Sequence, residues 1–234
     1  MSVQAPTDVH EHPDHPRLQH HFESMSQQHE ASSLGMWIFL STEVLFFGAL
    51  FLAYGFYRWL YYDAFIAASH HQNIVLGGIN TAVLICSSLT VAMSIYFAQR
   101  NRKKAVVVML VLTMLLGLAF LGIKAIEYNE HITHHLFPGP HFQFPDDPDT
   151  PAVDESRLAG TAQMFFVLYF FMTGLHAFHM VVGIGIYAWL LLRSMKREFG
   201  PDYYSPLEAG GLYWHFVDIV WIFLFPMLYL IGRH

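Results

Sequence analysis

Five long apolar stretches constrain this chain more than any other feature. Each contains about 20 or more mainly apolar residues, the length that an α-helix needs to cross the hydrocarbon core of a bilayer. The stretches are 34–60, 74–98, 105–128, 161–192 and 211–231. We therefore predict an all-α, polytopic membrane protein whose fold is a bundle of five transmembrane helices.

The composition agrees with a membrane protein. Hydrophobic residues make up 54% of the 234 positions and charged residues only 13%, unlike an average soluble domain. Residues 1–33 are polar and rich in His and Pro, with no basic segment ahead of an apolar core, so we expect no cleavable signal peptide. We divide the chain into this His-rich tail and a membrane domain, 34–234. Within that domain the Pro- and Asp-rich segment 129–160 is expected to be an irregular external loop.

The positions of the basic residues predict the orientation. Cytoplasmic loops carry an excess of Lys and Arg. With five spans, eight of the 12 basic residues fall on the side of the tail and of loops 99–104 and 193–210, and four fall on the opposite side. We expect a cytoplasmic N-terminus.

The single Cys86 excludes a disulfide within the chain, and nothing in the charge pattern indicates binding of nucleic acid.

Two acidic residues lie deep inside predicted spans, where a bare carboxylate is costly and is a functional hypothesis by default. Glu43 lies about 13 Å into its helix by helical rise, and we expect it to be protonated or hydrogen-bonded. Asp218 shares a helix face with Trp214 and His215, which are its expected local partners. Two interpretations stay open: a satisfied polar cluster that fixes helix packing, and a proton relay.

His176 and His179 lie three residues apart near the middle of the fourth span. Buried imidazoles can ligate a metal or a haem, but the only other deep candidate is His215. Hydrogen bonds between helices explain the pair more simply, so we expect no metal site. Lys124 and Glu127, one turn apart, are expected to form an ion pair that reaches the external interface.

The segment HITHH, residues 131–135, has the form of one histidine box of the membrane di-iron desaturases and hydroxylases. Those enzymes assemble several boxes on the cytoplasmic face. Here the box falls in the predicted external loop, and no second or third box follows. A polar loop is the favoured interpretation, and a desaturase-type metalloenzyme is the alternative.

Five segments, in order along the chain, resemble subunit III of the haem–copper cytochrome c oxidases. They are STEVLFF (41–47), INTAVLICSS (79–88), KAIEYNE (124–130), GLHAFHMVVG (174–183) and YWHFVDIVWIFLF (213–225). Together they span most of the chain beyond the tail. The chain resembles a short bacterial form with five helices in place of the seven of many members.

The resemblance implies an accessory subunit of a proton-pumping terminal oxidase, located in the bacterial inner (plasma) membrane. In that family subunit III carries no haem or copper, so it implies no catalytic residue and no cofactor in this chain, with both groups in partner subunits. It implies contacts with subunit I above all and with the other oxidase subunits, and cytochrome c as the electron donor. It also implies bound phospholipids, protection against loss of activity during turnover, and support of proton uptake at the path called D.

The resemblance also assigns individual residues. LRSMK (192–196) is similar to a segment that holds a lipid phosphate, so Arg193 and Lys196 are expected to bind phospholipid. The two missing helices form one wall of the lipid cleft in seven-span members, so a neighbouring subunit must supply that wall or the lipids lie more loosely.

The alternative that the chain is subunit III of a quinol-oxidising or nitric-oxide-reducing relative stays open. So does the role of the tail histidines, which could buffer protons.

Overall fold

The structure is a computed structural model that describes residues 22–140, 142–144, 155–196, 198–201 and 203–231. Six helices and no strand form in this described part. They are α1 (Met25–Leu60), α2 (Tyr62–His70), α3 (Ile74–Gln99), α4 (Lys103–Thr133), α5 (Glu155–Met195) and α6 (Ser205–Tyr229). The predicted all-α class is confirmed.

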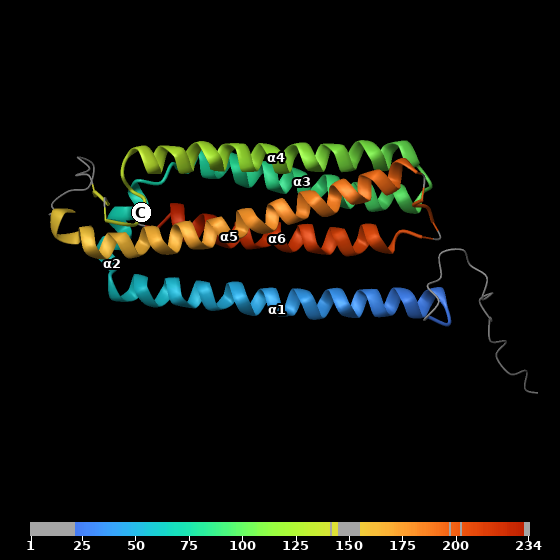
Figure 1. Ribbon diagram of the computed structural model, residues 1–234, viewed down its shortest axis with the longest axis horizontal. Helices are drawn as coiled ribbons and strands as arrows, with labels where there is room; N and C mark the ends of the chain where they lie inside the picture. The colour runs from blue at the N-terminus through green and yellow to red at the C-terminus, as the bar shows by residue number, and fades with distance from the viewer. Residues whose placement is uncertain (1–21, 141, 145–154, 197, 202, 232–234) are drawn as a thin grey trace, which may run out of the picture.

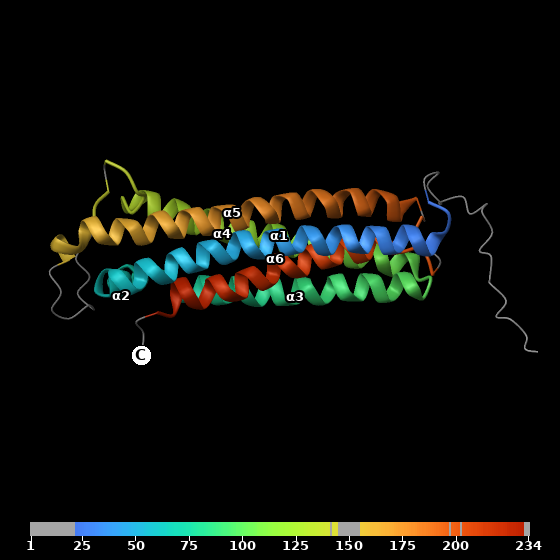
Figure 2. The same cartoon turned by 90° about the horizontal axis from the view of Figure 1, so that it is seen from below.

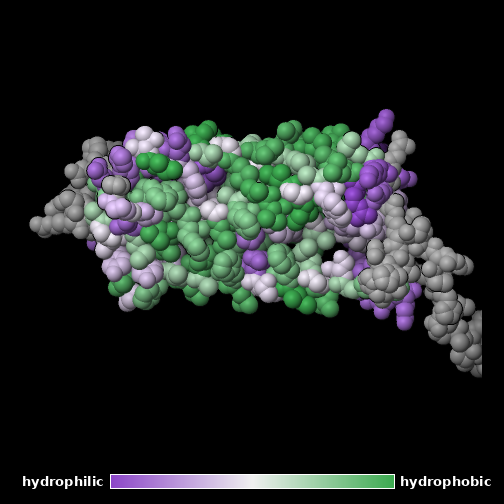
Figure 3. Space-filling view, in the orientation of Figure 1, coloured by the Kyte–Doolittle hydropathy of each residue, from purple (hydrophilic) through white to green (hydrophobic). Residues whose placement is uncertain are grey.

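Five of these helices, all except α2, are long and apolar enough to cross a membrane, which confirms the predicted number of spans. They run side by side along the length of the molecule (Figures 1 and 2). Apolar side chains dominate the middle of the face in Figure 3, and polar side chains gather toward its two ends. This is the distribution that a bilayer requires. The cytoplasmic position of the N-terminus stays a prediction.

A helix begins where predicted when its capping residue lies directly before its apolar stretch. Asn73 caps α3, since its Oδ1 accepts from the N–H groups of Val75 and Leu76 at 3.1 and 3.2 Å. By contrast, α1 begins at Met25, nine residues before its apolar stretch, because Ser24 supplies an earlier cap. Polar residues therefore extend several helices beyond the apolar stretches, and both α4 and α5 reach into the predicted loop 129–160.

The short helix α2 was not predicted, because its nine residues are too few to cross a membrane. It packs against α5 at the end of the bundle where α1 finishes, with Phe65 and Ala68 fully buried. Ser69 of α2 donates a hydrogen bond to the carbonyl of Ile231, just beyond α6. This contact connects the end of the last span to the segment between the first two.

Helices α3 to α6 pack on one another, and α1 lies on α5 and α6, on the side away from α4 (Figure 1). The indole of Trp214 fills the centre of the four-helix part and is buried. Two glycines make room for the indole. A Cβ at Gly117 of α4 would lie 2.9 Å from the ring, and a Cβ at Gly183 of α5 would lie 3.2 Å from it. Small residues thus allow close helix packing, as is usual in membranes.

We expect Gly117→Ala to destabilise the protein by about 1–3 kcal/mol, because the buried indole of Trp214 must move. Thermal unfolding of the detergent-solubilised protein measures this. Gly122→Ala on the same helix is the matched control, since a Cβ there meets nothing within 4 Å. It should be neutral or slightly stabilising. Equal destabilisation by both substitutions would exclude the Trp214 contact as the cause.

Candidate functional site

A buried ion pair connects three helices near the end of the bundle that carries α2. Lys124 Nζ lies 3.0 Å from Glu127 Oε2, and it also donates to the hydroxyls of Tyr169 and Tyr229, at 3.0 and 2.8 Å. Both hydroxyls donate in turn to Glu127 Oε1, at 2.7 and 2.5 Å. All three ammonium protons therefore have acceptors, and the carboxylate has three donors. We call these four residues the Lys–Glu–Tyr cluster.

The predicted ion pair forms, but the expectation that its charges reach out to solvent is wrong. The exposed fractions of the Lys124 and Glu127 side chains are 4% and 0%. The tyrosine hydroxyls of α5 and α6 supply the hydrogen bonds that water would supply at an interface, so neither charge needs to reach solvent. These tyrosines were missed because they are distant in sequence, 105 positions in the case of Lys124 and Tyr229.

His176 packs beside this cluster as an aromatic ring. Lys124 Nζ lies 5.2 Å from the centre of the Trp221 ring, and Trp221 lies 5.2 Å from the His176 ring. Phe120 contacts both rings, at 4.9 and 5.3 Å. His176 is fully buried, and neither of its ring nitrogens has a hydrogen-bond partner among the described residues. The expected hydrogen bond between helices is therefore wrong for His176.

The expected partners of Asp218 bind α3 instead. Trp214 Nε1 donates to Ser87 Oγ at 3.0 Å, and His215 Nδ1 lies 2.7 Å from Ser88 Oγ. The buried carboxyl oxygens of Asp218 have no hydrogen-bond partner in the part of the chain that the structure describes. Sharing one helix face thus did not decide the pairing, because Trp214 and His215 each bind a serine of α3.

Glu43 connects α1 to α5 through His179. Glu43 Oε2 lies 3.3 Å from His179 Nε2. His179 Nδ1 carries a proton, because it lies 2.9 Å from the carbonyl of Leu175, which can only accept. The ring also contacts Phe47 of α1, with centroids 5.4 Å apart. Glu43 therefore has His179 as a close neighbour across the α1–α5 contact, but its Oε2 makes no hydrogen bond within the described residues, and His179 does not pair with His176.

Two further contacts hold α1 at its ends. His29 Nδ1 lies 2.8 Å from Ser205 Oγ, and its Nε2 lies 3.9 Å from Glu208 Oε2. At the opposite end the Tyr54 hydroxyl donates to the carbonyl of Met227 at 2.5 Å. With the Glu43–His179 contact, α1 is attached to α5 and α6 at three levels.

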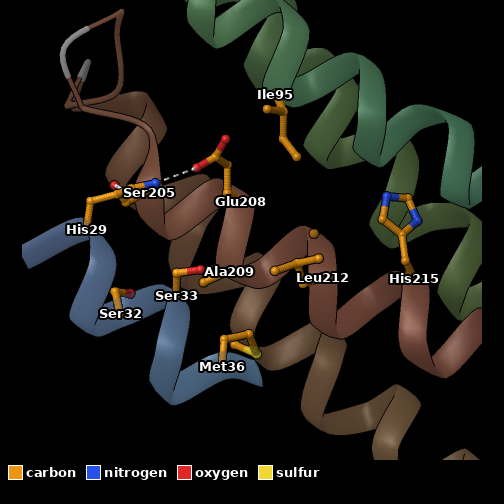
Figure 4. A pocket seen from close by; sticks show the side chains of 11 residues that line it. His29, Ser32, Ser33, Met36, Ile95, Ser205, Glu208, Ala209, Leu212 and His215 are labelled. Carbon is orange, nitrogen blue, oxygen red and sulfur yellow. Dashed lines mark hydrogen bonds and ion pairs between the residues drawn. The ribbon is translucent and has the colours of Figure 1, made fainter. Parts of the chain in front are cut away.

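A groove remains between α1 and α6, which we call the α1–α6 groove. Its polar mouth is a cavity of about 330 Å³ at the end where both helices begin, and its lining includes His29, Ser32, Ser33 and Glu208 (Figure 4). Its apolar part, about 450 Å³, follows α1 toward the middle of the bundle. This part is rich in aromatic side chains: Trp37, Phe47, Phe51, Phe216 and Phe223. Leu212 and His215 line both parts, so the two parts adjoin each other.

The predicted lipid-binding residues lie at the end of α5. Arg193 already has a carboxylate partner, since its Nε and Nη2 each lie 2.6 Å from Glu198 Oε2, and its guanidinium lies over the Trp189 ring. Lys196 is exposed. A lipid phosphate at Arg193 would compete with Glu198, and the lipid-binding role of Arg193 and Lys196 stays a prediction.

The candidate metal ligands do not converge. His176, His179 and His215 each have different neighbours. His131, from the possible histidine box, is buried with its Nε2 3.0 Å from Gln72 Oε1. In the described ranges no group of three or more His, Cys, Asp or Glu side chains is arranged to hold a metal ion. The tail histidines before Phe22 lie outside the described residues.

We expect Lys124→Met to destabilise the protein by about 3–5 kcal/mol, because it leaves the carboxylate of Glu127 buried without its cation. The double variant with Glu127→Leu should be less destabilised than Lys124→Met alone. Lys104→Met, at an exposed position of the same helix, is the matched control and should have little effect. Melting temperatures of the solubilised protein test this. An additive double variant would contradict the coupling.

Comparison with known proteins identifies the family. Residues 155–233 match the family model described as cytochrome c oxidase subunit III. "Quinol oxidase subunit 3" of Bacillus spizizenii is 30% identical over 223 residues, which cover 95% of this chain and 98% of that protein. The protein of the same name from Bacillus subtilis is 29% identical with the same coverage. "Probable quinol oxidase subunit 3" of Staphylococcus haemolyticus is 29% identical over 215 residues, which cover 90% of this chain and 94% of that protein.

These similarities extend over nearly the whole of both chains, and the relatives are bacterial. Together with five helices able to cross a membrane, they make this a multi-pass protein of the bacterial plasma membrane. The chain belongs to the subunit III family of the haem–copper oxidases.

Proposed function

We propose that this chain is the accessory, non-redox subunit III of a proton-pumping terminal oxidase, and that it stabilises subunit I. The observation that carries the proposal is the use of its membrane-buried polar groups. Lys124 and Glu127 hold α4, α5 and α6 together, and Trp214 and His215 hold α6 on α3. Such contacts favour a packing and support role. The histidine-box alternative loses its basis, because His131 binds Gln72 within the bundle and the family is that of the oxidases.

The outer face of α1 is the proposed contact with subunit I. Of the five candidate spans, α1 is the least covered by the rest of the protein. In its most apolar segment 11% of the residues are buried, against 56% in the corresponding segment of α6. Leu45, Leu52 and Trp59 are among its most exposed side chains. A partner helix laid on this face would also supply the wall that two further helices form in seven-span members.

We infer that the complex takes its electrons from a quinol. The support is the name of the relatives, quinol oxidase subunit 3, which match this chain over nearly its whole length. Cytochrome c is the second candidate donor, favoured by the segment 213–225 followed by Pro226 and by the description of the matching family. Bound phospholipids at Arg193 and Lys196, and support of proton uptake, complete the proposal.

Oxygen consumption by the purified complex distinguishes the two donors. We expect a reduced short-chain quinol to sustain faster turnover than reduced cytochrome c, because the relatives are quinol oxidases. The control is the same preparation with an inhibitor of the haem–copper centre, which should stop both reactions. Faster turnover with cytochrome c would overturn the choice of donor and leave the accessory role intact.

A complex that lacks this chain should keep its haem spectrum and its initial turnover but lose activity progressively, since the chain is proposed to support subunit I without holding a redox centre. Oxygen-electrode traces over repeated substrate additions, with spectra before and after, measure this. Re-addition of the chain should slow the loss. Immediate and complete loss of haem would contradict an accessory role.

A further inference from the structure

The charges of the α1–α6 groove are unsuited to an anionic headgroup. Its mouth contains the carboxylate of Glu208, and none of the described residues that line either part is Lys or Arg. A phosphate is normally held by cations or by several N–H donors, and here it would meet a negative charge. The mouth therefore favours a neutral headgroup that carries hydroxyl or carbonyl groups.

Hydrogen-bonding groups are available at separate places along the wall of the mouth. His215 Nδ1 is occupied by Ser88, and its Nε2 has no hydrogen-bond partner among the described residues. Among the described residues, the Glu208 carboxylate has only the distant contact with His29, at 3.9 Å. Figure 4 shows Glu208 and His215 at separate turns of α6, on either side of Leu212. A ring with hydroxyl groups on opposite edges can donate one hydrogen bond to the carboxylate while it hydrogen-bonds to the imidazole with the other.

The apolar part fits a long, flexible tail. From His29 to Phe51 the groove follows α1 for about 33 Å by helical rise, comparable with the thickness of the hydrocarbon core. Its lining is almost wholly apolar and aromatic, and the space beside Gly48 is empty, since a Cβ there would meet nothing within 4 Å. Both volumes lie within or near the range of small-molecule sites, about 300–1,000 Å³.

We propose that the α1–α6 groove binds a membrane quinol or quinone, with its ring in the polar mouth and its prenyl tail along α1. This rests on the proposed use of quinol by the complex. The site is a binding site only: no electron or proton is transferred there, and the bound molecule exchanges with the quinone of the membrane.

Photolabelling of the intact complex with an azido-quinone analogue tests the proposal. We expect the label on this chain, in peptides from 29–51 or 205–223. Gly48→Leu fills the apolar part and should lower labelling about tenfold. Gly55→Leu is the matched control, because it adds the same side chain to α1 in open space, at a residue that does not line the groove. It should leave labelling unchanged. Equal labelling of the two variants, or no label in either segment, would overturn the proposal.

A second pair of variants tests the mouth without adding a side chain to the apolar part. Glu208→Gln removes the charged acceptor for a quinol hydroxyl, and it should lower labelling by the analogue held in its reduced quinol form about tenfold. Glu30→Gln, at an exposed acid that does not line the mouth, should not lower it. Subunit stoichiometry of each purified complex shows whether it has assembled.

Solvent extraction of the same complexes distinguishes a quinone from a phospholipid. We expect Gly48→Leu to reduce the quinone that co-purifies per haem and to leave phospholipid unchanged. Loss of phospholipid in place of quinone would overturn the proposal. Quinol-driven oxygen consumption, measured in parallel, separates the proposed groove site from the proposed electron donor. Normal consumption, together with unaltered labelling of Gly48→Leu, refutes the groove site alone. A complex that consumes no oxygen with quinol refutes quinol as the donor.

Discussion

The buried pair of Lys124 and Glu127 is the interaction on which the rest of the bundle depends. Two opposite charges removed from water are stable only when every remaining hydrogen-bonding position is filled, and here Tyr169 and Tyr229 fill them. Because the four side chains come from α4, α5 and α6, the cluster fixes the position of these helices relative to one another. Hydrophobic attraction cannot do this between helices in lipid, so polar contacts and close packing take its place.

The acidic and imidazole side chains within the spans differ in their surroundings, because each one depends on the side chains that neighbouring helices bring to it. His179 shares a contact with Glu43 and joins α1 to the bundle. His176, three residues earlier, packs against the rings of Phe120 and Trp221. Asp218 is buried, and its expected partners Trp214 and His215 bind serines of α3. Position in the sequence indicated depth in the membrane for each of them, but depth alone did not decide which partner each one meets.

What could be predicted from the sequence follows from this distinction. The number of spans and the start of α3 were predictable, because length, hydropathy and the cap at Asn73 are local properties. The first turns of α1 and the whole of α2 were not, because polar or short segments give no signal of crossing a membrane. The partners of Trp214 and His215 were also missed. They are serines of α3, 127 positions away in the chain, and only the packing of α6 on α3 brings them together.

The sparse attachment of α1 has a consequence for access from the lipid. Its polar contacts with α5 and α6 are spaced along its length, at His29, Glu43 and Tyr54, and none of them belongs to the Lys–Glu–Tyr cluster. A small sideways displacement of α1 would widen the gap to α6 while the four-helix core stayed intact. A long molecule could then enter laterally from the bilayer, without first passing through water.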